Sequence, residues 1–265
     1  MDLQLAGKTA YVSGTASGIG ADIVRVLVDE EVRVFAVDFA IDALDAYVND
    51  ECLSTVTTHK ADLGELDQVN GAVDAAVAHF GSAPDILINN AGIGRMLPFE
   101  ELDDDDFHRT FEVNFFSVVR TCRRMLPLMK ANGGGAVVNV TSDLAAQPET
   151  VFVDYQASKA AIVNFSKSLS RSFAPTIRVN DVSPGPIWTP LWFREGGFVE
   201  TLEKNYGLKG RAAIDELIRD REIPMARMGE PVEVARAVAF LASPAAAFTT
   251  GSNLAVNGGT VRTAF

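Results

Sequence analysis

Residues 8–20 read Lys8-Thr-Ala-Tyr-Val-Ser-Gly14-Thr-Ala-Ser-Gly18-Ile-Gly20, a short apolar run that leads directly into three closely spaced glycines. The residues that follow have apolar side chains at helical spacing, namely Ile23, Val24, Leu27 and Val28. A strand, a glycine turn and a helix in this order direct backbone N–H groups and a helix N-terminus at one place, where a phosphate can bind. We therefore expect Gly14 to permit the turn, Gly18 to let a pyrophosphate approach and Gly20 to allow tight helix–strand packing. The alternative is a plain strand-to-helix turn.

The next apolar run, residues 32–37, ends at Asp38, 24 residues after Gly14. A carboxylate near this distance accepts hydrogen bonds from an adenosine ribose in dinucleotide-binding folds. Phe39 follows it, no basic residue lies beside it, and Ser17 in the glycine turn is uncharged. Because a 2′-phosphate would be repelled by this carboxylate, the residues favour NAD over NADP. The alternative is that Asp38 only caps the helix that follows.

Strand-like and helical segments alternate along the remaining chain. Further apolar runs lie at residues 54–59, 85–88, 136–140, 177–182 and 253–256. Alternation at this spacing predicts an α/β fold with one doubly wound parallel sheet, in a single domain over residues 1–265. Residues 186–224 lack a strand pattern and are rich in aromatic side chains, which predicts a long irregular substrate-binding lid.

Ligands of such sheets bind outside the carboxyl ends of the strands. Asn89, Ala91 and Gly92 follow one predicted strand, and Pro184 and Gly185 follow another. Small and amide side chains at these positions suit a ligand crevice. They are also compatible with an ordinary turn.

Tyr155 and Lys159 are four residues apart in a predicted helix, so their side chains share one face. A nearby ammonium group favours the phenolate, which predicts that the pKa of Tyr155 is lowered from about 10. Ser142 ends the preceding strand and can hydrogen-bond the same reacting oxygen. An aromatic ring packed on a lysine stem is the alternative interpretation of this pair.

Asn114 occurs at helical spacing between Phe111 and Val118, on the apolar face of a helix predicted over about residues 104–130. A buried amide without a partner costs about 1–3 kcal/mol, so we expect it to hydrogen-bond backbone or water. A structural role and a role in a proton relay both fit this observation.

The composition is that of an ordinary globular protein, with 265 residues, 48% hydrophobic and 22% charged. A net charge of −12 gives no basic footprint for nucleic acid or anionic membranes. Cys52 and Cys122 form no Cys-x-x-Cys motif, and the histidines lack metal-ligand spacing, so no metal site is predicted. No apolar run reaches about 18 residues and the first residues lack a basic start, so we expect a cytoplasmic protein.

Together these motifs resemble those of the classical short-chain dehydrogenase/reductase family, over nearly the whole chain. The matching landmarks are Gly14-x-x-x-Gly18-Ile19-Gly20, Asp62-Leu63, Asn89-Asn90-Ala91-Gly92, Asn114, Ser142, Tyr155-x-x-x-Lys159, Pro184-Gly185 and Val256-Asn257-Gly258-Gly259. Asn257 departs from the family, whose members more often carry aspartate there. The resemblance implies a seven-stranded parallel sheet, a nicotinamide cofactor and no catalytic metal.

The resemblance also implies a catalytic tetrad of Asn114, Ser142, Tyr155 and Lys159. Tyr155 would be the general acid/base, Lys159 would lower its pKa and bind the nicotinamide ribose, and Ser142 would polarise the carbonyl. Asn114 would hold a water that links Lys159 to solvent. By the same analogy the cofactor would contact Asp62 and Leu63, Asn89, Ile187 and Thr189.

The predicted reaction is hydride transfer between NAD(H) and a secondary alcohol or ketone. Trp188 and Trp192 in the lid suggest a cyclic or apolar substrate. Arg95 and Asp143 are the remaining predicted substrate contacts, with Arg95 neutralising an acidic group on the substrate. The alternative for Arg95 is a surface side chain paired with a glutamate at position 100 or 101.

Two rival functions remain from the sequence, an NADPH-dependent 3-oxoacyl-carrier-protein reductase and a non-catalytic dinucleotide-binding sensor or scaffold. Asp38 argues against the first, and the complete tetrad argues against the second. Small residues on the Tyr155 helix would let a second helix approach, at Ala157, Ser158, Ala160 and Ala161. The family assembles there, so we expect a homotetramer, or a dimer.

Overall fold

The computed structural model describes residues 2–45, 55–194 and 197–263. Within them, seven parallel strands form one sheet in the order β3-β2-β1-β4-β5-β6-β7. The strands are β1 (Thr9–Ser13), β2 (Arg33–Asp38), β3 (Val56–Lys60), β4 (Ile86–Asn89), β5 (Gly135–Val140), β6 (Ile177–Pro184) and β7 (Asn253–Val256). All seven predicted strands are present, although the predicted start of the third, at residue 54, lies outside the described residues.

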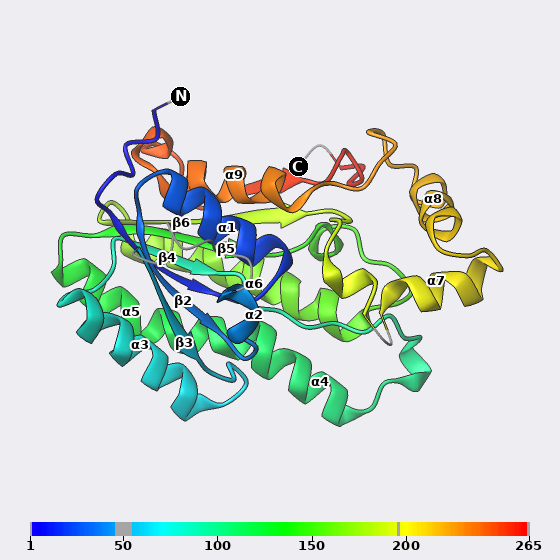
Figure 1. Ribbon diagram of the computed structural model, residues 1–265, viewed down its shortest axis with the longest axis horizontal. Coiled ribbons are helices and arrows are strands. Elements are labelled where there is room, and N and C mark those ends of the chain that lie inside the picture. The colour runs from blue at the N-terminus through cyan, green and yellow to red at the C-terminus, as the bar shows by residue number, and fades with distance from the viewer. Residues whose placement is uncertain (1, 46–54, 195–196, 264–265) are drawn as a thin grey trace.

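Helices cover both faces of the sheet (Figure 1). One face is covered by α1 (Gly18–Asp29) and α9 (Pro231–Ala242), and the other by α3 (Leu66–Phe80), α5 (Ser117–Ala131) and α6 (Val153–Phe173). Each layer has its own hydrophobic core, and the central strands are apolar on both sides because both sides are buried, whereas the edge strands β3 and β7 are more exposed. The predicted doubly wound parallel sheet is confirmed.

The helix predicted over residues 104–130 is interrupted. It consists of α4 (Asp104–Phe111), a π-helical turn (Glu112–Phe116) and α5. Single π-helical turns within α-helices occur frequently at functional sites. This turn carries Asn114, the buried amide that the sequence pattern singles out.

The segment of residues 186–224, called the lid segment below, differs from the expected irregular loop. It contains α7 (Phe198–Tyr206) and α8 (Arg211–Asp220), which lie beyond the carboxyl ends of the strands (Figure 1). These helices form because apolar side chains at helical spacing pack into a third core, among them Phe198, Leu202, Ile214, Leu217 and Ile218. The remaining short elements are α2 (Asp42–Asp45), η1 (Phe99–Glu101), η3 (Asp143–Ala145), η4 (Pro190–Trp192) and η5 (Pro244–Ala246).

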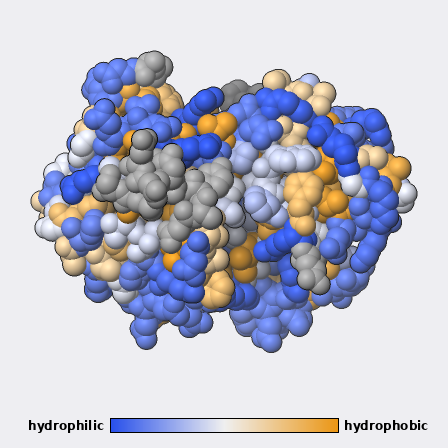
Figure 2. All heavy atoms as spheres, viewed as in Figure 1, coloured by the Kyte–Doolittle hydropathy of each residue, from blue (hydrophilic) through white to orange (hydrophobic). Residues whose placement is uncertain are grey.

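The surface shown in Figure 2 is largely hydrophilic, with hydrophobic residues in scattered small areas. In the part of the chain that the structure describes, no helix combines the length and apolarity needed to cross a membrane.

Cys122 is a buried free thiol, and Cys52 lies outside the described residues. Among the described residues, no group of three or more His, Cys, Asp or Glu side chains could hold a metal ion.

Candidate active site

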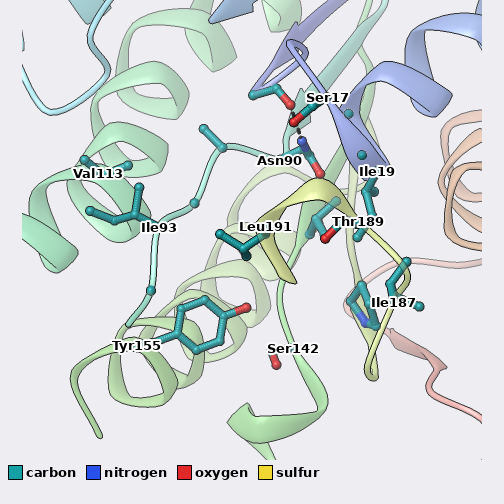
Figure 3. Close-up of a pocket in the computed structure, with 18 of the residues that line it drawn as sticks. Ser17, Ile19, Asn90, Ile93, Val113, Ser142, Tyr155, Ile187, Thr189 and Leu191 are labelled. Carbon is teal, nitrogen blue, oxygen red and sulfur yellow. Dashed lines mark hydrogen bonds between the residues drawn. The ribbon is translucent and has the colours of Figure 1, made fainter. Parts of the chain in front are cut away.

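A pocket of about 550 Å³ lies between the carboxyl ends of the strands and the lid segment. In Figure 3, Ser17 and Ile19 face it from the start of α1, Thr189 and Leu191 from the lid segment, and Tyr155 from α6. The predicted cofactor residues that line the pocket are Gly14, Ser17, Gly18, Ile19, Gly20, Asp38, Phe39, Asp62, Leu63, Ala91, Gly92, Tyr155, Lys159, Pro184, Gly185, Ile187 and Thr189. The fold thus brings motifs from distant parts of the chain to one cavity.

The glycine turn at one end of the pocket is as tight as its sequence predicts. Gly14 has a φ of +71°, which few other residues adopt. A Cβ at Gly20 would collide with the Gly14 carbonyl oxygen. Ser17, the N-cap of α1, makes no side-chain capping bond. The turn and the first N–H groups of α1 therefore have the arrangement expected of a cradle for an anionic group.

Two carboxylates line the pocket beyond this turn. Asp38 accepts hydrogen bonds from the backbone N–H of Ala16 at 3.0 Å and of Ala40 at 2.9 Å. Each carboxylate oxygen keeps acceptor capacity for a further donor. Asp62 forms an ion pair with Arg109 at 3.0 Å, and both side chains line the pocket. Asp38 is thus oriented by backbone, whereas Asp62 shares its charge with a cation.

Asn89 differs from its predicted position. Its side chain is 5% exposed, donates to Asn139 Oδ1 at 2.8 Å, and is not among the pocket-lining residues. Asn90 lines the pocket instead, and its side chain donates to the Gly14 carbonyl at 2.7 Å (Figure 3). Asn89 is the last residue of β4 and follows the strand's alternation into the buried layer, whereas Asn90 begins the loop.

Three predicted catalytic residues meet at the middle of the pocket. Tyr155, Ser142 and Lys159 all line it, and the Tyr155 ring points toward the cavity in Figure 3. The Lys159 ammonium lies 5.7 Å from the centre of the Tyr155 ring and donates to the Val140 carbonyl at 2.9 Å. A Cβ at Gly94 would lie 2.9 Å from the ring, so only a glycine lets the loop pack so closely on Tyr155.

The predicted pKa of Tyr155 is wrong for this structure. Burial raises the pKa of Tyr155 to about 12, although its hydrogen bond with Ser142 acts in the opposite direction. Burial also lowers the pKa of Lys159 to about 8, while the charge of Asp181 counteracts this effect. For both groups, burial outweighs the opposing effects, which come from Ser142 for Tyr155 and from Asp181 for Lys159. At neutral pH the phenol therefore holds its proton and the lysine retains most of its charge.

Asn114 is fully buried and does not line the pocket. Its amide nitrogen donates to the Ile93 carbonyl at 2.9 Å and to Ser158 Oγ at 3.0 Å, and its oxygen accepts from the Ile93 N–H at 2.8 Å. Both amide hydrogens are thus taken by protein atoms, whereas the amide oxygen keeps a lone pair for a further donor. The side chain joins the loop beside Tyr155 to α6.

The four predicted substrate residues fall into two groups. Asp143 and Trp192 line the pocket, whereas Arg95 and Trp188 do not. Arg95 is turned outward and forms an ion pair with Asp106, which contradicts its predicted contact with an acidic substrate. It pairs with neither Glu100 nor Glu101, because its side chain extends to Asp106 in the first turn of α4.

Trp188 also lies outside the pocket for a clear reason. Its ring packs on Phe193 with centroids 5.0 Å apart, and the Arg211 guanidinium lies 5.3 Å from it. These partners hold the indole within the lid segment, away from the cavity.

Several pocket residues belong to no sequence motif. Phe152, Leu217 and Arg221 line the end of the pocket beside Ser142, together with Phe198, one of the aromatic side chains of the predicted lid. They come from three separate parts of the chain. Their role depends on how the lid helices pack, which local spacing does not reveal.

Residues 14–261 match the family model described as enoyl-(acyl carrier protein) reductase. Cis-4-hydroxycyclohexanecarboxylate dehydrogenase of Sinomonas cyclohexanicum is 36% identical over 257 residues, which cover 96% of this chain and 96% of that protein. L-sorbose reductase from Gluconobacter frateurii, complexed with NADPH and L-sorbose, superposes with a TM-score of 0.90 and 30% identity, covering 99% and 100% of the two chains.

A second structural relative carries the other dinucleotide. The 3-ketoacyl-(acyl-carrier-protein) reductase from Brucella melitensis, complexed with NADH, has a TM-score of 0.83 and 31% identity, covering 97% and 100% of the chains. The family match, the parallel sheet and the glycine-lined pocket agree with one another. The chain is therefore a member of the classical short-chain dehydrogenase/reductase family, an oxidoreductase of alcohols and ketones that uses a nicotinamide dinucleotide.

Proposed function

We propose that this enzyme transfers hydride between NAD(H) and a secondary alcohol or ketone, with Tyr155 as the general acid/base. The observation that carries the proposal is the meeting of Tyr155, Ser142 and Lys159 in the same pocket as the glycine turn and Asp38. A bound nicotinamide ring supplies or accepts the hydride. The chain's own residues must hold the substrate oxygen and move its proton.

Tyr155 suits the role of acid in ketone reduction, because its phenol is protonated at neutral pH. It would donate its proton to the substrate oxygen, while the Ser142 hydroxyl would turn its one hydrogen from Asp143 Oδ1 to that same oxygen. The Lys159 ammonium would then stabilise the phenolate that remains. In the oxidation direction the same groups act in reverse, with the phenolate accepting the proton.

Asn114 acts in this scheme as a positioning residue. Its bonds to Ile93 and Ser158 join the loop that packs on Tyr155 to the helix that carries both Tyr155 and Lys159. A fixed ring orientation is needed for proton transfer over hydrogen-bond distance.

The preference for NAD is supported by Asp38. A ribose hydroxyl can donate to either carboxylate oxygen, whereas a 2′-phosphate would bring a second negative charge to the same place. The cation on the Asp62 side of the pocket, Arg109, is already paired with Asp62. We therefore propose that NAD(H) is used in preference to NADP(H).

Initial rates followed by nicotinamide absorbance, with NAD and NADP separately over cyclic and acyclic secondary alcohols, test this proposal. We expect kcat/KM for NAD to exceed that for NADP at least about tenfold, or about 1.4 kcal/mol. Asp38→Ser should reduce the ratio about tenfold, whereas Asp42→Ser, at an exposed aspartate nearby, should not change it. Equal or better use of NADP by the wild type would refute the NAD preference.

The rival 3-oxoacyl-carrier-protein reductase function is kept as a second candidate because the Brucella melitensis relative carries that description. A 3-oxoacyl thioester offered with NADPH and with NADH discriminates the two. Turnover of the thioester with NADPH, together with inactivity toward simple secondary alcohols, would favour the rival.

We also propose that the protein assembles as a homotetramer, or a dimer, through the α5 and α6 side of the sheet. Phe116 and Leu128 are 40% and 41% exposed there, an apolar surface that a second copy would cover. Ala157 and Ala160 are exposed on α6, whereas Ser158 is buried against Asn114 and does not belong to this surface. Size-exclusion chromatography with light scattering tests the expectation, and a monomer at micromolar concentration would contradict it.

A further inference from the structure

The substrate end of the pocket contains one carboxylate in a mainly apolar wall. Asp143 directly follows Ser142 and is 3% exposed. Apolar side chains from four parts of the chain line the same end, at Met96, Leu144, Phe152, Trp192, Phe198 and Leu217. A buried carboxylate in such surroundings is costly unless hydrogen bonds or charges compensate it.

The hydrogen bonds of Asp143 are incomplete. Its Oδ1 accepts from Ser142 Oγ at 3.2 Å, whereas its Oδ2 is buried and has no hydrogen-bond partner. Unsatisfied buried polar atoms are few in folded proteins and commonly mark a functional site or a missing ligand. Since Asp143 lines the pocket, a donor on a bound substrate is well placed to complete its bonding.

The cation beside Asp143 is already shared with a second carboxylate. Arg221, from the end of α8, lines the pocket, but its guanidinium forms an ion pair with Glu149 at 2.6 Å. Burial raises the pKa of Asp143, whereas the charge of Arg221 and the bond from Ser142 lower it. Two carboxylates thus face one guanidinium, so Arg221 has no unshared positive charge to offer a substrate carboxylate.

We propose that Asp143 accepts a hydrogen bond from a second hydroxyl group, close to the reacting carbon, and that the substrate is a neutral vicinal diol or α-hydroxy ketone. The proximity follows from Ser142, whose one hydroxyl hydrogen bonds Asp143 Oδ1 in this structure and would turn to the reacting oxygen when substrate binds. Oδ2 of Asp143 would therefore lie near the substrate carbon next to the reacting carbon. This inference rests on the proposed alcohol/ketone oxidoreductase function.

Matched substrate pairs test the inference on the wild-type enzyme. The pairs are cyclohexane-1,2-diol with cyclohexanol, and butane-2,3-diol with butan-2-ol, each assayed with NAD and NADP. We expect kcat/KM for the diol to exceed that for the mono-alcohol at least about tenfold, because a hydrogen bond to a charged group discriminates by about that factor or more. 2-Hydroxycyclohexane-1-carboxylate should be used less well than the diol.

Asp143→Asn keeps the shape of the side chain but removes its charge, and should reduce the diol preference several-fold. Asp143→Leu removes both oxygens and should abolish the preference. Asp105→Asn, at an exposed position of α4, is the matched control and should keep the wild-type ratio. NADH binding, followed by fluorescence, verifies that each variant is folded.

The outcomes separate this inference from the proposed function. Turnover of mono-alcohols without a diol preference, a preference unchanged in both Asp143 variants, or better use of the carboxylate would overturn the inference alone. Absence of turnover for every member of the panel would overturn the proposed function as well. A diol preference that Asp143→Leu abolishes and Asp105→Asn retains would establish it.

Discussion

Asp181 offers the sharpest test of the electrostatics at this site. It lies within β6 at 3% exposure, and its carboxylate accepts from Asn139 Nδ2 at 3.4 Å. Burial raises the pKa of Asp181 from 3.8 to about 7, although Ser166, Asn139 and the charge of Lys159 all act to lower it. We predict that Asp181→Asn stabilises the folded protein at neutral and alkaline pH.

The magnitude follows from proton linkage. Below about pH 4 the carboxyl group is protonated in both the folded and the unfolded chain, so it contributes no pH-dependent term. As pH rises toward 7 the unfolded chain loses this proton first, so the folded state becomes progressively less stable. A rise from 3.8 to about 7 corresponds to about 4 kcal/mol above pH 7, at about 1.4 kcal/mol per pKa unit. Asparagine has no such cost.

Urea unfolding at pH 5, 6, 7 and 8, followed by tryptophan fluorescence at one protein concentration, measures the effect. The free energy of unfolding of Asp181→Asn relative to wild type should increase by about 2–3 kcal/mol between pH 5 and pH 8. The exposed Asp105→Asn change should show no such increase. A stability difference that is independent of pH, or an asparagine variant that is less stable at pH 8, would show that burial does not raise the pKa of Asp181.

Asn114→Ala removes the bonds to Ile93 and Ser158 and should lower the free energy of unfolding by about 1–3 kcal/mol, measured by urea titration. Unchanged stability would show that these bonds contribute nothing. Gly20→Ala places a methyl group against the Gly14 carbonyl and should weaken NADH binding at least about tenfold, measured by fluorescence titration. Gly71→Ala is its control, since a Cβ there meets nothing within 4 Å and should leave NADH affinity unchanged. Equal affinities of both glycine variants would contradict the proposed cradle.

The sheet and the nucleotide end of the pocket could be predicted from local patterns. The central strands are buried on both faces and read as short apolar runs, and the glycine turn needs conformations that few other residues adopt. Those constraints act over a few residues, so they are visible in the sequence. One prediction at this end was wrong by a single residue. Side chains alternate between the two faces of β4, so Asn89 is buried and Asn90 lines the pocket.

The substrate end could not be predicted in the same way. Arg95 directly follows Ala91-Gly92-Ile93-Gly94 in sequence, but its ion pair with Asp106 is a tertiary contact that turns it outward. Arg221 reaches the pocket only because α8 packs as it does. The pKa of Tyr155 likewise depends on burial, which the four-residue spacing to Lys159 does not reveal.

We infer that the Tyr155 hydroxyl exchanges the substrate proton in the same pocket that binds the dinucleotide. The decisive experiment is to measure kcat/KM and NADH affinity for Tyr155→Phe, because the change removes a single oxygen. We expect a loss of about 100-fold to 10,000-fold in turnover, with NADH affinity close to that of the wild type. Turnover within about tenfold of an active wild type would contradict it, and a wild type that binds NADH but turns over nothing would favour a dinucleotide sensor.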